Sequence, residues 1–244
     1  MRSLIVKLIP ALVIPMLMLV SCKKDETEER IIEYGVMSDV EGHAYTTVKI
    51  GDQWWMAENL RVGSFNDGTP IAYIPRIDGA DTAWANCTTP AYMSINDSVF
   101  GKLYNGAVIG SEKSIAPVGW HVPTDEDWKK LEQALGMSVS ESNQTGWRGD
   151  NEADLMTSKY NLGWPAGDKE KGLYGLDTYG FDALPSGCRG ADGRTNIQNN
   201  TAFWWSSSRI GNDFIYRYID LMEKRVFRQQ IPAGYGMCIR CVKN

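Results

Sequence analysis

Residues 119–128 read Gly-Trp-His-Val-Pro-Thr-Asp-Glu-Asp-Trp, and this stretch predicts the start of the clearest helix in the chain. Thr124 can cap the helix, and the three acidic residues that follow it favour the positive end of the helix dipole. Trp128, Leu131 and Leu135 then fall on one helical face. The sequence therefore predicts an amphipathic helix that packs against a core.

A hairpin is predicted ahead of this helix. Residues 44–50 form a strand pattern with Thr46, Val48 and Ile50 on one face, and residues 53–56 return after a Gly-Asp turn. Glycine supplies the backbone freedom that such a tight turn needs.

Further elements are predicted along the rest of the chain. A short helix is expected at residues 152–158, and a second hairpin at residues 214–221 and 225–228. The chain closes with a short strand at residues 237–242. Residues 62–100 are rich in Gly, Pro, Asp, Asn and Thr, which predicts long irregular loops with short strands.

The N-terminus is typical of an exported lipoprotein. Residues 1–21 carry Arg2 and Lys7 and then an apolar run of about 13 residues, whereas a membrane-spanning helix needs roughly 20. The run ends in Leu-Val-Ser-Cys, which resembles a bacterial lipoprotein box. We therefore expect residues 1–21 to be a signal peptide and Cys22 to be lipidated, so that its acyl chains anchor the protein in the lipid bilayer.

The residues after the anchor predict a tether. Residues 22–38 begin with a polar, mostly acidic run that cannot join a core, so we expect them to be disordered. Lys24-Asp25-Glu26 resembles the short signal that sends lipoproteins of Bacteroidota-like bacteria to the outer face of the cell. The expected location is the outer membrane with the domain exposed at the cell surface, and the periplasmic face is the alternative.

Composition limits the classes of protein that this chain can represent. Without residues 1–21, 223 residues remain, which is enough for one large domain or two small ones. The mature chain has 23 basic and 30 acidic residues and no basic patch, so nucleic acid is not an expected partner. Nine Trp, eleven Tyr and 24 Gly favour a loop-rich fold with aromatic packing.

Four cysteines follow the anchor: Cys87, Cys188, Cys238 and Cys241. An even number in an exported chain predicts two disulfides, and the pairing stays open. Because residues three apart on a strand point to opposite faces, we expect Cys238 and Cys241 to bond to Cys87 or Cys188 rather than to each other. A zinc site is the alternative for four thiols.

Six segments carry a resemblance to a known family. They are Thr-Val-Lys-Ile-Gly-Asp-Gln-Trp-Trp-Met-Ala-Glu-Asn-Leu at 47–60, Gly-Lys-Leu-Tyr-Asn at 101–105, the stretch at 119–128, Tyr-Gly-Phe-Asp-Ala-Leu-Pro at 179–185, Trp-Trp-Ser-Ser-Ser at 204–208 and Ile-Arg-Cys-Val-Lys at 239–243. In this order they resemble the Fibrobacter succinogenes major paralogous domain (FISUMP), here at residues 39–244.

That family is similar to the formylglycine-generating-enzyme branch of the C-type-lectin-like fold, whose Leu-Pro-Thr-Glu-x-Glu-Trp helix start resembles residues 122–128. The resemblance implies an α+β domain with small, twisted, mostly antiparallel sheets, one or two flanking helices and long loops. Oxidases of that branch use a copper-binding cysteine pair. The only close pair here, Cys238 and Cys241, lacks the oxidase's intervening loop, so we expect no oxidase activity.

Catalytic and metal-binding motifs are missing from the sequence. It has no GxSxG, HExxH or glycine-rich phosphate loop. His121 is expected to be hydrogen-bonded within the packed structure, and His43 to be solvated. Residues 150–154 fail the EF-hand pattern, and only a looser calcium site stays open there. We expect no cofactor and no metal.

Tryptophans are the candidate ligand-binding residues. Trp84, Trp147 and Trp164 lie in residues 62–100 and 137–175, where long loops could present them for stacking on a ligand. The alternative is that each pins its loop to the domain.

Two adjacent tryptophan pairs are assigned to the core instead. Trp54-Trp55 and Trp204-Trp205 fall on predicted strands, where neighbouring side chains point to opposite faces.

These observations favour one function over two others. The anchor, the fold and the missing catalytic motifs predict a non-catalytic surface module that binds a glycan or a protein. A structural or assembly subunit of a surface appendage or envelope complex is the alternative, and an enzyme ranks last. The chain is divided into residues 1–21, 22–38 and 39–244.

Overall fold

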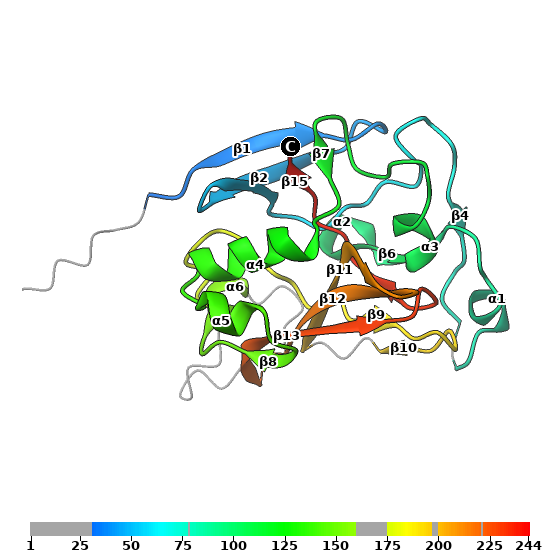
Figure 1. Cartoon of the computed structure of the whole chain (residues 1–244). Coiled ribbons are helices and arrows are strands. Elements are labelled where there is room, and N and C mark those ends of the chain that lie inside the picture. The colour runs from blue at the N-terminus through cyan, green and yellow to red at the C-terminus, as the bar shows by residue number, and fades with distance from the viewer. Residues whose placement is uncertain (1–30, 78, 160–174, 197–199, 221) are drawn as a thin grey trace, which may run out of the picture. The chain divides into compact units, whose positions relative to one another are not determined.

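The computed structural model describes residues 31–77, 79–159, 175–196, 200–220 and 222–244, which form a mixed α+β fold (Figure 1). Most of the regular structure is in three sheets, and the helices are few and short. The predicted fold class is therefore confirmed at this level. The predicted signal peptide and Cys22 lie outside the described residues.

The first sheet joins the beginning of the described chain to its end, in the order β1-β2-β3-β15-β7. Each strand pair in it is antiparallel. Its strands are β1 (Tyr34–Ser38), β2 (Ala44–Ile50), β3 (Gln53–Met56), β15 (Val242–Lys243) and β7 (Trp120–His121).

The second sheet has six strands in the order β10-β9-β14-β6-β5-β4, and only β4 and β5 pair in parallel. Its strands are β10 (Thr195–Asn196), β9 (Cys188–Arg189), β14 (Gly236–Met237), β6 (Gly101–Asn105), β5 (Ala91–Asn96) and β4 (Ala72–Tyr73). Single-turn helices lie in its connections: α1 (Thr82–Ala85), α2 (Asp97–Phe100) and α3 (Gly106–Ile109).

The third sheet is an antiparallel meander that ends in a short edge strand, in the order β11-β12-β13-β8. Its strands are β11 (Thr201–Ile210), β12 (Asp213–Asp220), β13 (Glu223–Ile231) and β8 (Gly146–Arg148). Three helices lie beside it in Figure 1: α4 (Asp125–Ala134), α5 (Val139–Ser142) and α6 (Glu152–Met156).

The predicted hairpin at residues 44–56 is confirmed as β2 and β3. Gly51 in the turn has a φ of +58°, a left-handed conformation that glycine adopts without strain. Val48 and Ile50 are buried, whereas Thr46, which was predicted to share their face, is exposed and lines a surface pocket. The second predicted hairpin is present as β12 and β13, and the short predicted helix as α6.

Helix α4 begins where the sequence predicted. The hydroxyl of Thr124 accepts a hydrogen bond from the backbone N–H of Asp127 at 3.1 Å, and the Asp127 carboxylate accepts one from the Thr124 N–H at 2.9 Å. This reciprocal capping box satisfies two N–H groups that a helix start otherwise leaves unpaired. Trp128 and Leu131 are fully buried, so the predicted apolar face is confirmed.

Strand β11 lies between two parts of the hydrophobic core. Trp204 belongs to a cluster with Trp55, Trp128 and Phe181, here called the Trp128 cluster. The next residue, Trp205, belongs to a second cluster, here called the Trp205 cluster. Adjacent side chains on a strand point to opposite faces, so one Trp-Trp pair fills both sides of β11. Both rings are fully buried, as predicted for core residues.

Two predicted boundaries are wrong. Strand β1 falls within residues 22–38, which were predicted to be a disordered tether, yet each of its residues pairs with β2. The predicted terminal strand at residues 237–242 is instead split between β14 and β15, which belong to different sheets. The split follows from the partners of the residues between them: Cys238 pairs with Trp204, whereas the carbonyl of Ile239 accepts from Leu60.

Candidate functional site

Segments that carry the family resemblance meet around one buried amide. The Asn59 Oδ1 atom accepts hydrogen bonds from Trp204 Nε1 at 2.9 Å and from Arg240 Nε at 2.8 Å. Its Nδ2 atom donates to the carbonyl of Phe100 at 2.9 Å. Each polar atom of this buried side chain is therefore used to join distant parts of the chain.

Arg240 bonds to that amide and to the segment that carries Asp182. It donates to the carbonyls of Phe181 and Asp182, and its guanidinium stacks 4.3 Å from the centroid of the Phe181 ring. Burial lowers the pKa of Arg240 to about 10. The negative charges of Asp182, Asp177 and Glu58 oppose that shift.

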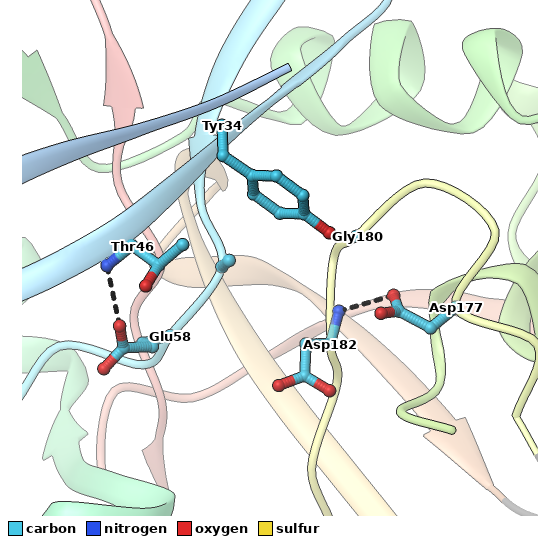
Figure 2. Close-up of a pocket in the computed structure, with 7 residues that line it drawn as sticks. Tyr34, Thr46, Glu58, Asp177, Gly180 and Asp182 are labelled. Carbon is cyan, nitrogen blue, oxygen red and sulfur yellow. Dashed lines mark hydrogen bonds between the residues drawn. The ribbon is translucent and has the colours of Figure 1, made fainter. Parts of the chain in front are cut away.

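A surface pocket with a volume of about 270 Å³ opens over these three acidic residues. Figure 2 shows the Tyr34 ring pointing toward Gly180 across the pocket. We call it the acidic pocket, and it is lined by Tyr34 from β1, Thr46 from β2, Ala57 and Glu58 after β3, and Asp177, Gly180 and Asp182 from the loop before β9.

Glu58 is fixed on one wall of the acidic pocket. Its Oε1 atom accepts a hydrogen bond from the Thr46 N–H at 2.6 Å, and its Oε2 atom lies 3.0 Å from Arg61 Nη1. Arg61 also donates to the carbonyl of Ala44 at 2.7 Å. These contacts hold the Glu58 carboxylate in one orientation.

Asp177 and Asp182 form the opposite wall. Both have positive φ angles, +38° and +52°, which aspartate tolerates better than most residues. Asp177 Oδ1 accepts from the Asp182 N–H at 2.8 Å. Burial raises the pKa of Asp177, and the charge of Asp182 raises it further. Among the described residues, Asp182 Oδ1 is buried and has no hydrogen-bond partner.

The acidic pocket thus presents oriented acceptors beside one exposed aromatic ring. A carboxylate accepts hydrogen bonds but cannot donate them, so the complementary ligand groups are hydroxyls, amides or cationic nitrogens. Within the described ranges, no group of three His, Cys, Asp or Glu side chains is placed to hold a metal ion.

Three tryptophans were predicted to bind ligand. The prediction for Trp84 is wrong, because its side chain is 1% exposed and its Nε1 donates to the carbonyl of Gly234 at 2.8 Å. Trp147 is partly exposed on β8, and its ring packs against Tyr218 and Phe227 with centroids 5.1 Å away. Trp164 lies outside the described residues. Neither Trp84 nor Trp147 lines the acidic pocket.

The two predicted disulfides are not formed in the structure, where all four candidate cysteines are free thiols. Cys238 packs in the Trp128 cluster, whereas Cys188 and Cys241 pack in the Trp205 cluster. Cys87 is partly exposed and donates to the carbonyl of Thr89 at 3.3 Å. Burial raises the pKa of Cys188 and of Cys238 to about 12, so these thiols pack as neutral apolar groups.

The histidines and the residues considered for calcium have structural contacts. His121 bonds through Nε2 to Asp127 at 3.0 Å and through Nδ1 to Asn244 at 2.8 Å, as predicted for a packed histidine. His43 was predicted to be solvated, and it is partly exposed and bonded to Asp39 at 2.9 Å.

Of the segment 150–154, Glu152 Oε2 accepts from the N–H groups of Asp150 and Asn151. Asp154 lies 3.4 Å from Lys224 Nζ.

A buried ion network that the sequence analysis missed holds α4 on the third sheet. Glu132 bonds to Arg148 at 2.7 and 2.8 Å and to Arg217 at 2.6 Å. Asp125 bonds to Arg217 at 2.9 Å and to Arg228 at 2.8 and 2.7 Å. Burial alone would raise the pKa of Asp125, but hydrogen bonding from Arg228 and the charge of Arg217 hold it well below its usual value.

These features define a class of protein: a mixed α+β domain of small sheets that carries an acidic surface pocket on a hydrogen-bonded frame. The chain belongs to the Fibrobacter succinogenes major domain family, whose family model matches residues 48–243. A search of curated proteins and a search of solved structures each found no match. None of the described helices is both long and apolar enough to cross a membrane.

The pocket residues were not singled out from the sequence, although a signal for some of them was present. Glu58 and Asp182 lie inside two of the quoted family segments, 47–60 and 179–185. They are acidic residues within otherwise mostly apolar or aromatic motifs. Tyr34 had no such signal, because it lies in the segment that was predicted to be disordered.

Proposed function

We propose that this chain is a non-catalytic binding module of the cell envelope, and that it binds a surface glycan or protein through the acidic pocket. The observation that carries the proposal is the buried, unpartnered Oδ1 atom of Asp182 beside Asp177, whose pKa is raised. A buried acceptor without a donor is costly. A ligand that donates a hydrogen bond there would remove that cost.

The pocket favours a ligand with several donors and one flat apolar face. Sugar rings have both features, because their hydroxyls donate and their C–H faces stack on aromatic rings such as Tyr34. A lysine or arginine side chain of a protein ligand would use the same carboxylates. Binding rather than catalysis is favoured because Glu58 and Asp177 already accept hydrogen bonds that maintain the walls of the pocket.

We also propose the finer classification as a C-type-lectin-like domain. It is supported by the resemblance of residues 122–128 to the helix start of the formylglycine-generating-enzyme branch. The capping box at Thr124 and the buried Trp128 give that motif its physical role.

The proposed location is the outer membrane, with a lipid on Cys22 and the domain at the cell surface. It is supported by the basic and then apolar N-terminal sequence, by the Leu-Val-Ser-Cys motif and by Lys24-Asp25-Glu26. The periplasmic face is the alternative location.

An assembly role is the second candidate function, and edge strand β1 favours it. Within the described residues β1 pairs only with β2, and its Val36 side chain is 77% exposed. An exposed edge with an apolar residue can accept a strand from another protein.

A glycan array probed with the full-length chain in detergent tests the binding proposal. We expect Asp182→Asn and Tyr34→Ala to lower the array signal at least tenfold without changing the melting temperature. Tyr73→Ala is the matched control, because Tyr73 is 53% exposed and Tyr34 is 54% exposed. Binding that survives both pocket substitutions would contradict the proposed site, and an array without any signal would favour assembly.

Lipidation is tested separately at Cys22. The Cys22→Ala variant should take up no labelled palmitate and should leave the membrane fraction, because several acyl chains on one residue provide the anchor. Uptake of label and sedimentation with membranes by the variant would show that Cys22 is not the anchor.

A further inference from the structure

A second surface hollow differs from the acidic pocket in charge. It has a volume of about 420 Å³, within the range of small-ligand sites, about 300–1,000 Å³. We call it the Arg209 groove, and it lies between α3, the loop before β5 and the turn that joins β11 to β12. None of the described residues that line it is acidic, although acidic residues outnumber basic ones in the chain.

Arg209 is held on the wall of the groove by the geometry of its hairpin. It is the cross-strand partner of Phe214, and its guanidinium lies 4.2 Å from the centroid of that ring. Only Gly211 and Asn212 connect the two strands, and Gly211 has a φ of +62°. A two-residue turn of this kind fixes the register, so the stacking of arginine on phenylalanine is built into the hairpin.

Gly110 on the neighbouring wall leaves room for this guanidinium. A Cβ atom at Gly110 would overlap Arg209 Nη2, so the side chain lies directly against the glycine backbone. Gly106, one helical turn earlier, is similarly close to Ala233. The shape of the groove therefore depends on two glycines. Of the two possible alanine substitutions, Gly110→Ala is the one that would displace the Arg209 side chain directly.

Arg209 differs from most of the other described arginines in its partners. Arg148, Arg189 and Arg217, for example, each bond to a buried or partly buried carboxylate. Arg209 is exposed, and within the part of the chain that the structure describes it has no carboxylate partner. Its planar fork of N–H donors matches a carboxylate or a phosphate, and it is already oriented by the ring beneath it.

Hydroxyl and amide groups surround the guanidinium. Thr88, Ser111 and Asn212 line the groove, and the Ser111 hydroxyl oxygen accepts from the Lys113 N–H at 3.1 Å. That contact orients Ser111 and leaves its proton free to be donated. A hydroxyl can both donate and accept, so these groups suit a ligand that is itself rich in hydroxyls.

We propose that the Arg209 groove binds an acidic saccharide, with the carboxylate of a uronic acid unit on the Arg209 guanidinium and its hydroxyls on Thr88, Ser111 and Asn212. This site is separate from the acidic pocket, shares no lining residue with it and selects a ligand of opposite charge. The proposal therefore does not depend on ligand binding at the acidic pocket.

Calorimetric titration of the full-length chain in detergent with tetragalacturonate tests this proposal. We expect saturable binding, weakened about tenfold or more by Arg209→Gln and by Gly110→Ala, because a charge-assisted hydrogen bond pair is lost. Arg209→Lys should bind with intermediate affinity, since it keeps the charge without the fork. Arg225→Gln is the control, because Arg225 is also exposed but bonds to Glu223 at 2.8 Å.

The probes also separate a saccharide site from a general anion site. A neutral galactose tetramer should bind at least tenfold more weakly than tetragalacturonate, and so should inorganic phosphate or acetate. The proposal is overturned if tetragalacturonate does not bind, if Arg209→Gln binds it as well as the unaltered chain does, or if phosphate or acetate binds equally tightly. Melting temperatures should be unchanged in the Arg209 variants, because the side chain is exposed.

Discussion

The ion network under α4 and the acidic pocket both combine carboxylates with a buried arginine. They differ in how many of those carboxylates bond to an arginine side chain. In the network, Asp125 and Glu132 bond directly to arginine side chains. Beneath the pocket, Arg240 bonds to backbone carbonyls and an amide, and within the described residues Glu58 is the only pocket carboxylate that forms an ion pair with an arginine, Arg61. The network carboxylates are therefore paired within the protein, whereas Asp177 and Asp182 in the pocket can still accept hydrogen bonds from a ligand.

The pKa directions follow this difference. The pKa of Asp125 is held well below its usual value, because the hydrogen bond from Arg228 and the charge of Arg217 outweigh the effect of burial. The pKa of Asp177 is raised, because burial, together with the charge of Asp182, outweighs the hydrogen bond from the Asp182 N–H and the charges of Arg240 and Lys159. Two acidic residues in one domain thus have opposite effects on stability, and direct contact with a guanidinium decides which effect applies.

The largest expected effect is in the network. Glu132→Gln should lower the free energy of unfolding by about 3–5 kcal/mol, because Arg148 and Arg217 would remain buried without their shared carboxylate. Glu126→Gln on the same helix is the control, since Glu126 is largely exposed, and it should change stability by less than about 0.5 kcal/mol. Urea denaturation measures both. Equal midpoints for the two variants would show that the buried network does not stabilise the fold.

A smaller effect is expected beneath the pocket. Arg240→Met should cost about 1–3 kcal/mol, because the carbonyls of Phe181 and Asp182 lose their donor. Without the positive charge of Arg240, the ionised pocket carboxylates also repel one another more strongly. The loss of unfolding free energy should therefore be smaller below about pH 4, where carboxylates become neutral. The exposed Arg194→Met variant is the control. A cost that does not vary with pH would mean that Arg240 acts only through packing and hydrogen bonds.

The smallest expected effect has the opposite sign. A raised pKa means that the folded protein favours the protonated form of Asp177, so its ionisation costs stability above about pH 4. Asp177→Asn should therefore stabilise the fold at pH 7 by up to about 1 kcal/mol and have no effect near pH 3. Thermal unfolding at the two pH values checks this, with the exposed Asp52→Asn as the control. Destabilisation at pH 7 would show that Asp177 is paired more strongly than its surroundings suggest.

The elements that the sequence predicted correctly depend on neighbours in the chain. The capping box of α4 joins Thr124 to Asp127, and the hairpin of β2 and β3 needs only a glycine turn between two strand patterns. The apolar face of α4 follows from helical periodicity, which also predicted that Trp128 would be buried. Local hydrogen bonds and side-chain spacing fix such features, so the sequence alone can reveal them.

The errors arose where distant segments decide the outcome. Trp84 looked like an exposed loop residue, but it is covered by contacts that include the carbonyl of Gly234, 150 residues further along the chain. Residues 34–38 looked like part of a polar tether until β2 supplied their pairing partner. The cysteine count predicted two disulfides, whereas all four cysteines are free, and Cys238 packs in a different cluster from Cys188, one of its two predicted partners.

The sequence by itself determined the family, the α+β class, the capped helix and the aromatic core, because each is encoded by patterns of nearby residues or by motifs in order. Only the tertiary structure decided which charges are paired. Glu132 meets Arg217 across 85 positions of the chain, and Asn59 meets Arg240 across 181. Electrostatic and hydrogen-bond energies depend on distance in space and on burial, and the folded chain sets both.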